Sequence, residues 1–217
     1  MKKLFVTGFA ILLSACASIK LENPPLLSPF GDGTQWVVWE EMEFLVQLDD
    51  NSVTSVRVPR GFVSDLASTP KMFWSIYPPF GKYLSASVLH DYLYWRQICK
   101  KDEADKIFYQ TMHDAGVDQA TQSRFFVALN KEGKDAWDRN GTERANGLVR
   151  VIPEDFLTSK EVKRSATTLW SEFRESLRKQ NVREQTQPSD EGIPKVCMAL
   201  AREIKVKTAL MSVVFGK

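Results

Sequence analysis

The spacing of hydrophobic residues changes from strand-like to helix-like along the first two thirds of the chain. The segment Gln35–Leu48 is dense in β-branched and aromatic residues, and Val53–Val58 alternates between two faces. The polar residues Asp49–Ser52 between these segments are typical of a turn, and Pro59 cannot donate a hydrogen bond to a neighbouring strand. The pattern predicts a β-hairpin, followed by a loop over residues 60–70.

Three later segments carry hydrophobic residues at the three- and four-residue spacing of amphipathic helices. They span about residues 82–97, 101–115 and 119–131. The break at Ile98–Lys100 is short enough for the first two helices to pack antiparallel. Together with the hairpin, these segments predict an α+β fold in which a β-hairpin or small sheet packs on a helical bundle.

The sequence becomes polar and irregular after residue 137. Further on, Thr158 and Glu161 match a capping box, which predicts that an amphipathic helix begins there. A last amphipathic segment spans residues 194–215. We therefore expect an α+β domain over residues 35–137, which folds by itself, and a helical C-terminal extension over residues 138–217.

The first residues have the organisation of a bacterial signal peptide. Lys2 and Lys3 precede the hydrophobic run Leu4–Leu13, which is shorter than the roughly 20 residues that a membrane-spanning helix needs. The chain that follows, up to residue 34, is rich in Pro, Ser and Gly and shows no hydrophobic periodicity. We interpret residues 1–15 as a signal peptide and residues 16–34 as a tether that begins at a modified cysteine.

The sequence Leu13-Ser14-Ala15-Cys16 resembles the lipobox of bacterial lipoproteins. That resemblance implies that Cys16 becomes the N-terminal residue and carries diacylglycerol and a fatty acid such as palmitate. Ala17 follows it, in place of the Asp that retains lipoproteins at the inner membrane of enteric bacteria. We therefore expect an outer-membrane lipoprotein that faces the periplasm and binds the membrane through Cys16.

Composition narrows the range of partners. Lys2 and Lys3 are the only charged residues of the predicted signal peptide, so the remaining chain carries 27 basic and 27 acidic residues. Because this part of the chain has no net charge, its composition does not favour a nucleic acid as partner. The identity of a protein partner is left open. The other two cysteines, Cys99 and Cys197, can form a disulfide in an oxidising periplasm, and two buried free thiols are the alternative.

Four residues on the first two predicted helices could carry chemistry. His90 and Tyr94 are four residues apart and share a helix face, whereas the adjacent Asp91 does not face His90. Asp105 lies at the border of the hydrophobic stripe of the second helix, from which it can approach His90 or Tyr94 if the helices pack antiparallel. A carboxylate that holds one imidazole nitrogen leaves the other free to act as a base.

Two longer motifs resemble a known family. They read VPRGFVSDLASTP at Val58–Pro70 and LHDYLY at Leu89–Tyr94. Four further residues complete the pattern: Trp74, Asp105, Gly133 and Trp137. On these motifs, about residues 56–137 are similar to a family of phage and bacterial proteins known as domain of unknown function 1353, with Ser64 in place of the usual Thr. The family name implies no activity.

The order His-Asp-x-x-Tyr followed by a helical Asp is also similar to the motif of secreted phospholipase A2. This resemblance implies that His90 is a general base and that Tyr94 and Asp105 orient it. Asp91 would bind calcium, with Asp65 as a further oxygen ligand, and carboxylate ligands favour calcium or magnesium over zinc. The chain departs from that family because it lacks the flanking cysteines and the glycine-rich calcium loop.

Two functions of different classes are compatible with these residues. In the first, the protein is a His/Asp-dependent hydrolase of lipid or another cell-envelope substrate. In the second, His90, Asp91 and Asp105 form a polar cluster that stabilises the fold, because buried polar groups need partners. The protein is then a non-catalytic envelope or phage-derived lipoprotein with a binding or structural role.

The prediction for Cys16 can be tested directly. We expect Cys16→Ser to abolish acylation, because the hydroxyl does not form the thioether that carries the lipid. Cells grown with a labelled fatty acid should incorporate label into the wild-type protein and into a Cys99→Ser control, but not into Cys16→Ser. Equal labelling of the wild type and Cys16→Ser would contradict the prediction.

Overall fold

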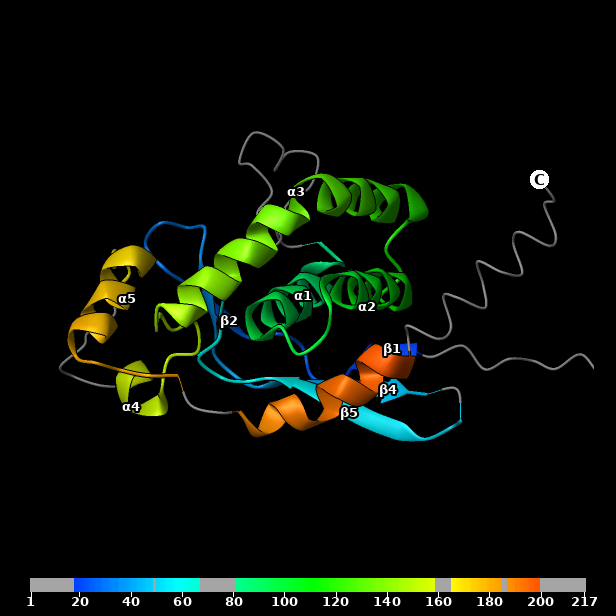
Figure 1. The fold of residues 1–217 in the computed structure, drawn as a ribbon, viewed down its shortest axis with the longest axis horizontal. Helices are drawn as coiled ribbons and strands as arrows, with labels where there is room; N and C mark the ends of the chain where they lie inside the picture. Colours follow the sequence, from blue (N-terminus) through cyan, green and yellow to red (C-terminus); the bar gives the residue numbers. More distant parts are fainter. Residues whose placement is uncertain (1–17, 49, 67–80, 159–164, 185–186, 200–217) are drawn as a thin grey trace, which may run out of the picture.

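The protein has the α+β fold that the sequence predicts (Figure 1). The computed structural model describes residues 18–48, 50–66, 81–158, 165–184 and 187–199. Two small antiparallel sheets belong to the N-terminal part of the chain, and most helices follow them in sequence. None of the helices in these ranges is long and apolar enough to cross a membrane.

Six short strands form two sheets of three strands each. The first sheet has the order β1-β4-β5, with β1 at Ser18–Leu21, β4 at Met42–Gln47 and β5 at Val53–Val58. The second has the order β2-β3-β6, with β2 at Leu27–Pro29, β3 at Trp36–Val38 and β6 at Val63–Ser64. The antiparallel pair β4–β5 confirms the predicted hairpin.

The predicted first strand of the hairpin is divided between the two sheets. Residues 36–38 form β3 of the second sheet, and the same hydrophobic run continues as β4 of the first. The strand is divided because its neighbouring residues Val37 and Val38 are buried in different hydrophobic cores. Val38 is buried in the main hydrophobic core, whereas Val37 is buried in a smaller core. One hydrophobic segment therefore serves two cores.

The prediction that residues 16–34 form a tether is wrong from residue 18 onward. β1 pairs with β4 and β2 pairs with β3, each at the edge of its sheet. Ile19 is 3% exposed and Phe30 is 2% exposed, so both belong to the hydrophobic cores. Pro29 is compatible with an edge strand, where its missing N–H can face solvent. Because these strands have only four and three residues, they leave no periodic pattern in the sequence.

Three helices occupy the segments where helices were predicted. They are α1 (Leu84–Arg96), α2 (Lys101–Asp114) and α3 (Gln119–Ala145), and each of them packs against the other two. The side chain of Asp118 caps α3 by accepting a hydrogen bond from the backbone N–H of Thr121 (2.9 Å).

Helix α3 is longer than predicted. It continues to Ala145, so the expected domain boundary after residue 137 falls inside a helix. The part of α3 beyond that boundary is polar because it lies largely on the surface, with Asn140 as its one buried residue. Figure 1 shows α3 extending past α1 and α2 toward the C-terminal helices. Over residues 138–145, the polar sequence therefore marks an exposed helix and not an irregular connection.

The C-terminal extension shares a hydrophobic core with the N-terminal strands. Val149 and Ile152 follow α3, and α5 spans Trp170–Lys179. The smaller core consists of Phe30, Val37, Val63, Val149, Ile152, Trp170, Phe173 and Leu177. These residues come from both sides of the predicted boundary, so the domain and its extension do not have separate cores.

The predicted helix start at Thr158 is also wrong. Thr158 is the C-terminal cap of the short helix α4 (Glu154–Leu157), and residues 165–169 are not helical. Glu161, the other residue of the predicted capping box, lies outside the described residues. The predicted hydrophobic face is nevertheless present in α5, whose buried residues are Trp170, Phe173 and Leu177.

The last described segment returns to the main core. A 3₁₀ helix, η2 (Pro188–Gly192), continues into helical residues 193–199, and the remainder of the predicted amphipathic segment lies outside the described residues. Cys197 forms a disulfide with Cys99, with Cα atoms 5.8 Å apart. The disulfide decides between the two alternatives for these cysteines and covalently links the C-terminal segment to the loop between α1 and α2.

The shared core predicts that α5 contributes to global stability. Leu177 is fully buried, so Leu177→Ala should lower the free energy of unfolding by about 2–5 kcal/mol. Leu169 precedes the same helix and is 38% exposed, so we expect Leu169→Ala to change it by only about 0.5 kcal/mol. Urea unfolding of the three proteins measures the difference. If Leu177→Ala and Leu169→Ala had the same free energy of unfolding, the C-terminal extension would be separable from the rest of the fold.

Candidate functional site

A buried carboxylate joins α1 to α2. Oδ1 of Asp105 lies 2.9 Å from His90 Nε2 and accepts a hydrogen bond from Tyr94 Oη (2.6 Å). Oδ2 of Asp105 accepts a hydrogen bond from Lys101 Nζ (2.7 Å). We call these four residues the His90 cluster. The expected approach of Asp105 to His90 and Tyr94 is therefore observed, although their proposed catalytic roles stay predictions.

The charge states within the His90 cluster follow from burial and hydrogen bonding. Burial lowers the pKa of His90 more than the hydrogen bond and charge of Asp105 raise it, so the imidazole is neutral near pH 7. Burial also opposes ionisation of Asp105, but hydrogen bonds from His90, Lys101 and Tyr94 outweigh it and hold the pKa of Asp105 below its usual value. An ionised carboxylate can only accept, so His90 Nε2 carries the proton and Nδ1 carries the lone pair.

Aromatic rings fix the position of the imidazole. The rings of Tyr94 and Phe108 have centroids 4.1 Å and 4.7 Å from that of His90. Trp137 contacts Tyr94 edge-on at 5.1 Å. Where α3 crosses the cluster it carries Gly133, and a Cβ atom there would lie only 2.8 Å from Tyr94 Oη. Gly133 therefore leaves room for the Tyr94 hydroxyl, and Trp137 packs against the Tyr94 ring.

Lys101 is a further member of this site that was not predicted from the sequence. Its ammonium group also lies within 3.4 Å of the carbonyl oxygen of Leu129 and over the ring of Tyr94, with the nitrogen 5.9 Å from the ring centroid. Lys101 precedes Asp105 by four residues on α2, and this i,i+4 pairing was a usable signal. Its positive charge lowers the pKa of His90 and so favours the neutral imidazole.

Asp91 belongs to a different contact, between α1 and the loop after β6. Its Oδ2 atom accepts hydrogen bonds from Ser64 Oγ and from the backbone N–H of Asp65 (3.2 Å). Burial and the negative charge of Asp65 raise the pKa of Asp91 well above its usual value, although Arg150 and Ser64 act in the opposite direction. The motif that contains Ser64 and Asp65 is thereby attached to α1 next to the His90 cluster.

The described residues do not by themselves make the predicted calcium site. Asp65 and Asp91 supply two carboxyl groups, whereas calcium takes about six to eight oxygen ligands. In the described ranges, no third acidic, His or Cys side chain joins them in a cluster of metal-binding size. One such cluster exists elsewhere, formed by Cys99, Glu103 and Cys197, but its two sulfur atoms are joined in the disulfide.

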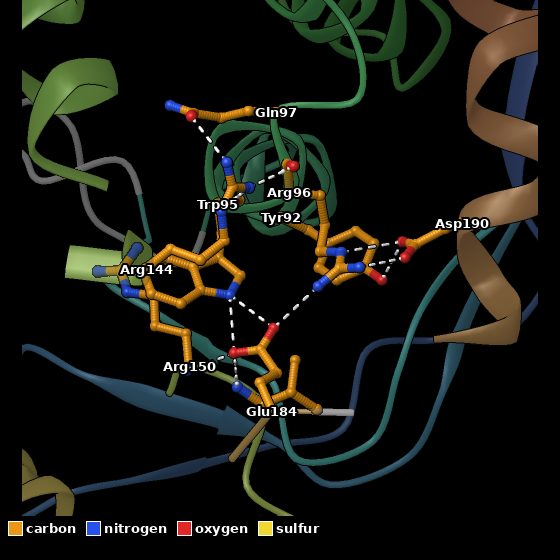
Figure 2. Close-up of polar contacts among 9 residues, drawn as sticks. Tyr92, Trp95, Arg96, Gln97, Arg144, Arg150, Glu184 and Asp190 are labelled. Carbon is orange, nitrogen blue, oxygen red and sulfur yellow. Dashed lines mark hydrogen bonds and ion pairs between the residues drawn. The ribbon is translucent and has the colours of Figure 1, made fainter. Parts of the chain in front are cut away.

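A second polar cluster, which the sequence did not reveal, surrounds Glu184 (Figure 2). The Glu184 carboxylate accepts hydrogen bonds from Trp95 Nε1 (2.7 and 2.9 Å) and Arg96 Nη1 (3.1 Å). It also accepts one from the backbone N–H of Arg150 (3.0 Å). Nearby, Asp190 accepts hydrogen bonds from Tyr92 Oη (2.9 Å) and from the guanidinium group of Arg96.

This Glu184 cluster also closes the C-terminal end of α1. The guanidinium group of Arg144, on α3, donates hydrogen bonds to the carbonyl oxygens of Trp95 (2.6 Å) and Arg96 and to Oε1 of Gln97 (3.0 Å). Helix ends leave carbonyl oxygens that need such donors. Because Glu184 is itself saturated by several donors from α1 and the chain near residue 150, we interpret this cluster as a structural connection between α1 and the C-terminal segment.

The fold and the His90 cluster define a small α+β protein in which a buried His–Asp–Tyr arrangement joins two helices. Residues 36–129 match the family model described as protein of unknown function, DUF1353, which is a little under half of the chain. This part of the protein belongs to that family, as its motifs predicted. No curated protein and no solved structure matches the chain.

The charge state of His90 predicts a pH dependence of stability. The folded protein keeps His90 neutral, whereas in the unfolded chain it takes up a proton below its usual pKa of about 6.5. The contribution of His90 to stability is therefore complete above about pH 6.5 and is lost as the pH falls below it.

Urea unfolding between pH 5 and pH 7.5 measures this dependence. His90→Gln should show a smaller loss of unfolding free energy on acidification than the wild type. His113 is exposed and is the other histidine of the chain, so His113→Gln serves as the control for the replacement of a histidine by glutamine. Parallel pH profiles for the wild type and His90→Gln would show that the folded protein protonates His90 as easily as the unfolded chain does.

Proposed function

We propose that the protein is a cell-envelope lipoprotein whose domain hydrolyses a lipid or another envelope substrate, with His90 as general base. The observation that carries this proposal is the contact of 2.9 Å between His90 Nε2 and an ionised Asp105. Such a contact orients the imidazole and leaves Nδ1 as the basic nitrogen. Tyr94 and Lys101 position Asp105 in turn.

The proposed reaction requires only these groups and water. Nδ1 of His90 takes a proton from water while the water oxygen attacks the carbonyl carbon of the substrate. Asp105 stabilises the imidazolium ion that forms, because its charge is already held in place. The imidazolium then gives the proton to the leaving group and becomes neutral again.

Anchoring at the outer membrane, on its periplasmic side, is part of the same proposal. The lipobox-like sequence that ends in Cys16 supports it. The disulfide between Cys99 and Cys197 supports it independently, because disulfides persist in oxidising compartments such as the periplasm.

A second function from a different class remains a competing proposal. His90 and Asp105 are each less than 10% exposed, and the charge of Asp105 is matched by three donors. A cluster of this kind can have a purely structural role, in which it joins α1 to α2. The protein would then be a non-catalytic lipoprotein, of the envelope or of phage origin, that binds a partner through another surface.

Matched histidine variants separate the two proposals. The acylated protein is mixed with vesicles of phosphatidylethanolamine and phosphatidylglycerol, and released fatty acid is measured with calcium and with a chelator. We expect His90→Gln to lower the rate by about 10²–10⁴-fold, the usual contribution of a general base. The rate for His113→Gln should equal that of the wild type.

Stability measurements on the same proteins complete the test. A catalytic His90 predicts that His90→Gln stays folded at the assay temperature. If the wild type releases no fatty acid under either condition, and His90→Gln is strongly destabilised, the structural role is the correct one. Loss of activity in His113→Gln as well would indicate that the assay reports stability and not catalysis.

A further inference from the structure

We propose that one end of the first sheet lies directly against the lipid bilayer and fixes the orientation of the domain on the membrane. This inference rests on the proposed acylation of Cys16. The surface, which we call the anchor end, comprises Ser18 on β1, Gln47 on β4 and Val53 on β5, which are neighbours in the sheet. Asp114 at the end of α2 also belongs to it.

The connection between the acylated residue and the folded domain is very short. Ser18 is the first residue of β1, and only Ala17 separates it from Cys16. Because an extended chain spans at most about 3.6 Å per residue, the Cα atom of Cys16 lies within about 7 Å of that of Ser18. A lipid inserted in the bilayer at Cys16 therefore brings the start of β1 to the membrane surface.

The start of β1 is held firmly in the domain. Ser18 pairs with Gln47, and the side chain of Ile19 is buried in the main core. The backbone N–H of Ile19 donates a hydrogen bond of 2.7 Å to Asp114 Oδ2. β1 cannot separate from the sheet without losing these contacts, so the folded domain and not a flexible segment meets the membrane.

The anchor end exposes hydrophobic side chains. Val53 is 63% exposed, next to Gln47 and the turn that joins β4 to β5. Figure 1 shows the start of β1, the adjoining ends of β4 and β5 and the end of helical residues 193–199 at the same end of the molecule. Met198, on that helical segment, is 56% exposed. A bilayer surface is the partner that such side chains fit when a lipid anchor holds them in place.

The orientation also narrows the substrate class of the proposed reaction. Asp105 precedes Asp114 by nine residues on α2, which corresponds to about 14 Å along the helix axis. Along α2, Asp105 of the His90 cluster is therefore separated by about 14 Å from Asp114 of the anchor end. A substrate that belongs to the membrane, such as a phospholipid or another lipid-linked molecule at the bilayer surface, can reach this distance more readily than a distant envelope polymer.

Two matched valines test the orientation. Val53→Cys and Val127→Cys are introduced separately into the full chain and labelled with a nitroxide, since Cys99 and Cys197 are joined in a disulfide. Val127 is 65% exposed and lies on α3, so it matches Val53 in residue type and exposure. In phosphatidylethanolamine and phosphatidylglycerol vesicles, we expect the label at Val53 to lose accessibility to a water-soluble nickel complex severalfold, and the label at Val127 to be unchanged.

Insertion of ten Gly and Ser residues between Ala17 and Ser18 provides a second variant. A flexible linker of that length has a mean extension of about 16–19 Å, which should return the label at Val53 to aqueous accessibility. Acylated protein in which both labels are equally accessible would overturn the orientation while leaving the anchor intact. If the N-terminal mass shows no acyl group on Cys16, the anchor itself is wrong and the orientation is overturned with it.

Discussion

The packing of α1 against α2 depends on the hydrogen bonds that the ionised carboxylate of Asp105 accepts. A buried charge is costly unless donors surround it, and here α1 supplies two donors while α2 supplies the third. The arrangement fixes the spacing of the two helices and the tautomer of His90 at the same time. A catalytic role and a structural role of the His90 cluster thus require the same geometry. Activity and stability must therefore be measured together to distinguish the two roles.

The C-terminal segment also contacts α1. Glu184 and Asp190 bind side chains near the end of α1, and the disulfide joins Cys197 to the loop that follows it. Since α5 also completes the smaller core, the part of the chain that matches the DUF1353 family shares that core with residues outside the match. Residues outside the family match, including Gly133 and Trp137, support the His90 cluster within it.

In the proposed orientation, the position of β1 places the folded domain at the membrane. A long tether would let the domain rotate freely, whereas a strand that begins at Ser18 leaves almost no free chain after Cys16. The same short strand therefore belongs to the main core through Ile19 and sets the proposed distance of the His90 cluster from the bilayer.

The sequence by itself determined the features that depend on local contacts. The hairpin, the three helices and the meeting of His90, Tyr94 and Asp105 follow from periodicity and from one short turn, because i,i+4 spacing and a tight connection leave few arrangements. The i,i+4 spacing of Lys101 and Asp105 could also have been recognised from the sequence.

Only the tertiary structure decided the contacts between distant segments. β1 is too short to show a period, and two other strands separate it in the chain from β4, with which it pairs. The hydrogen bond of Trp95 to Glu184 and the disulfide join residues 89 and 98 positions apart. Such pairings are selected by the burial of the whole core, and no window of the sequence contains both partners.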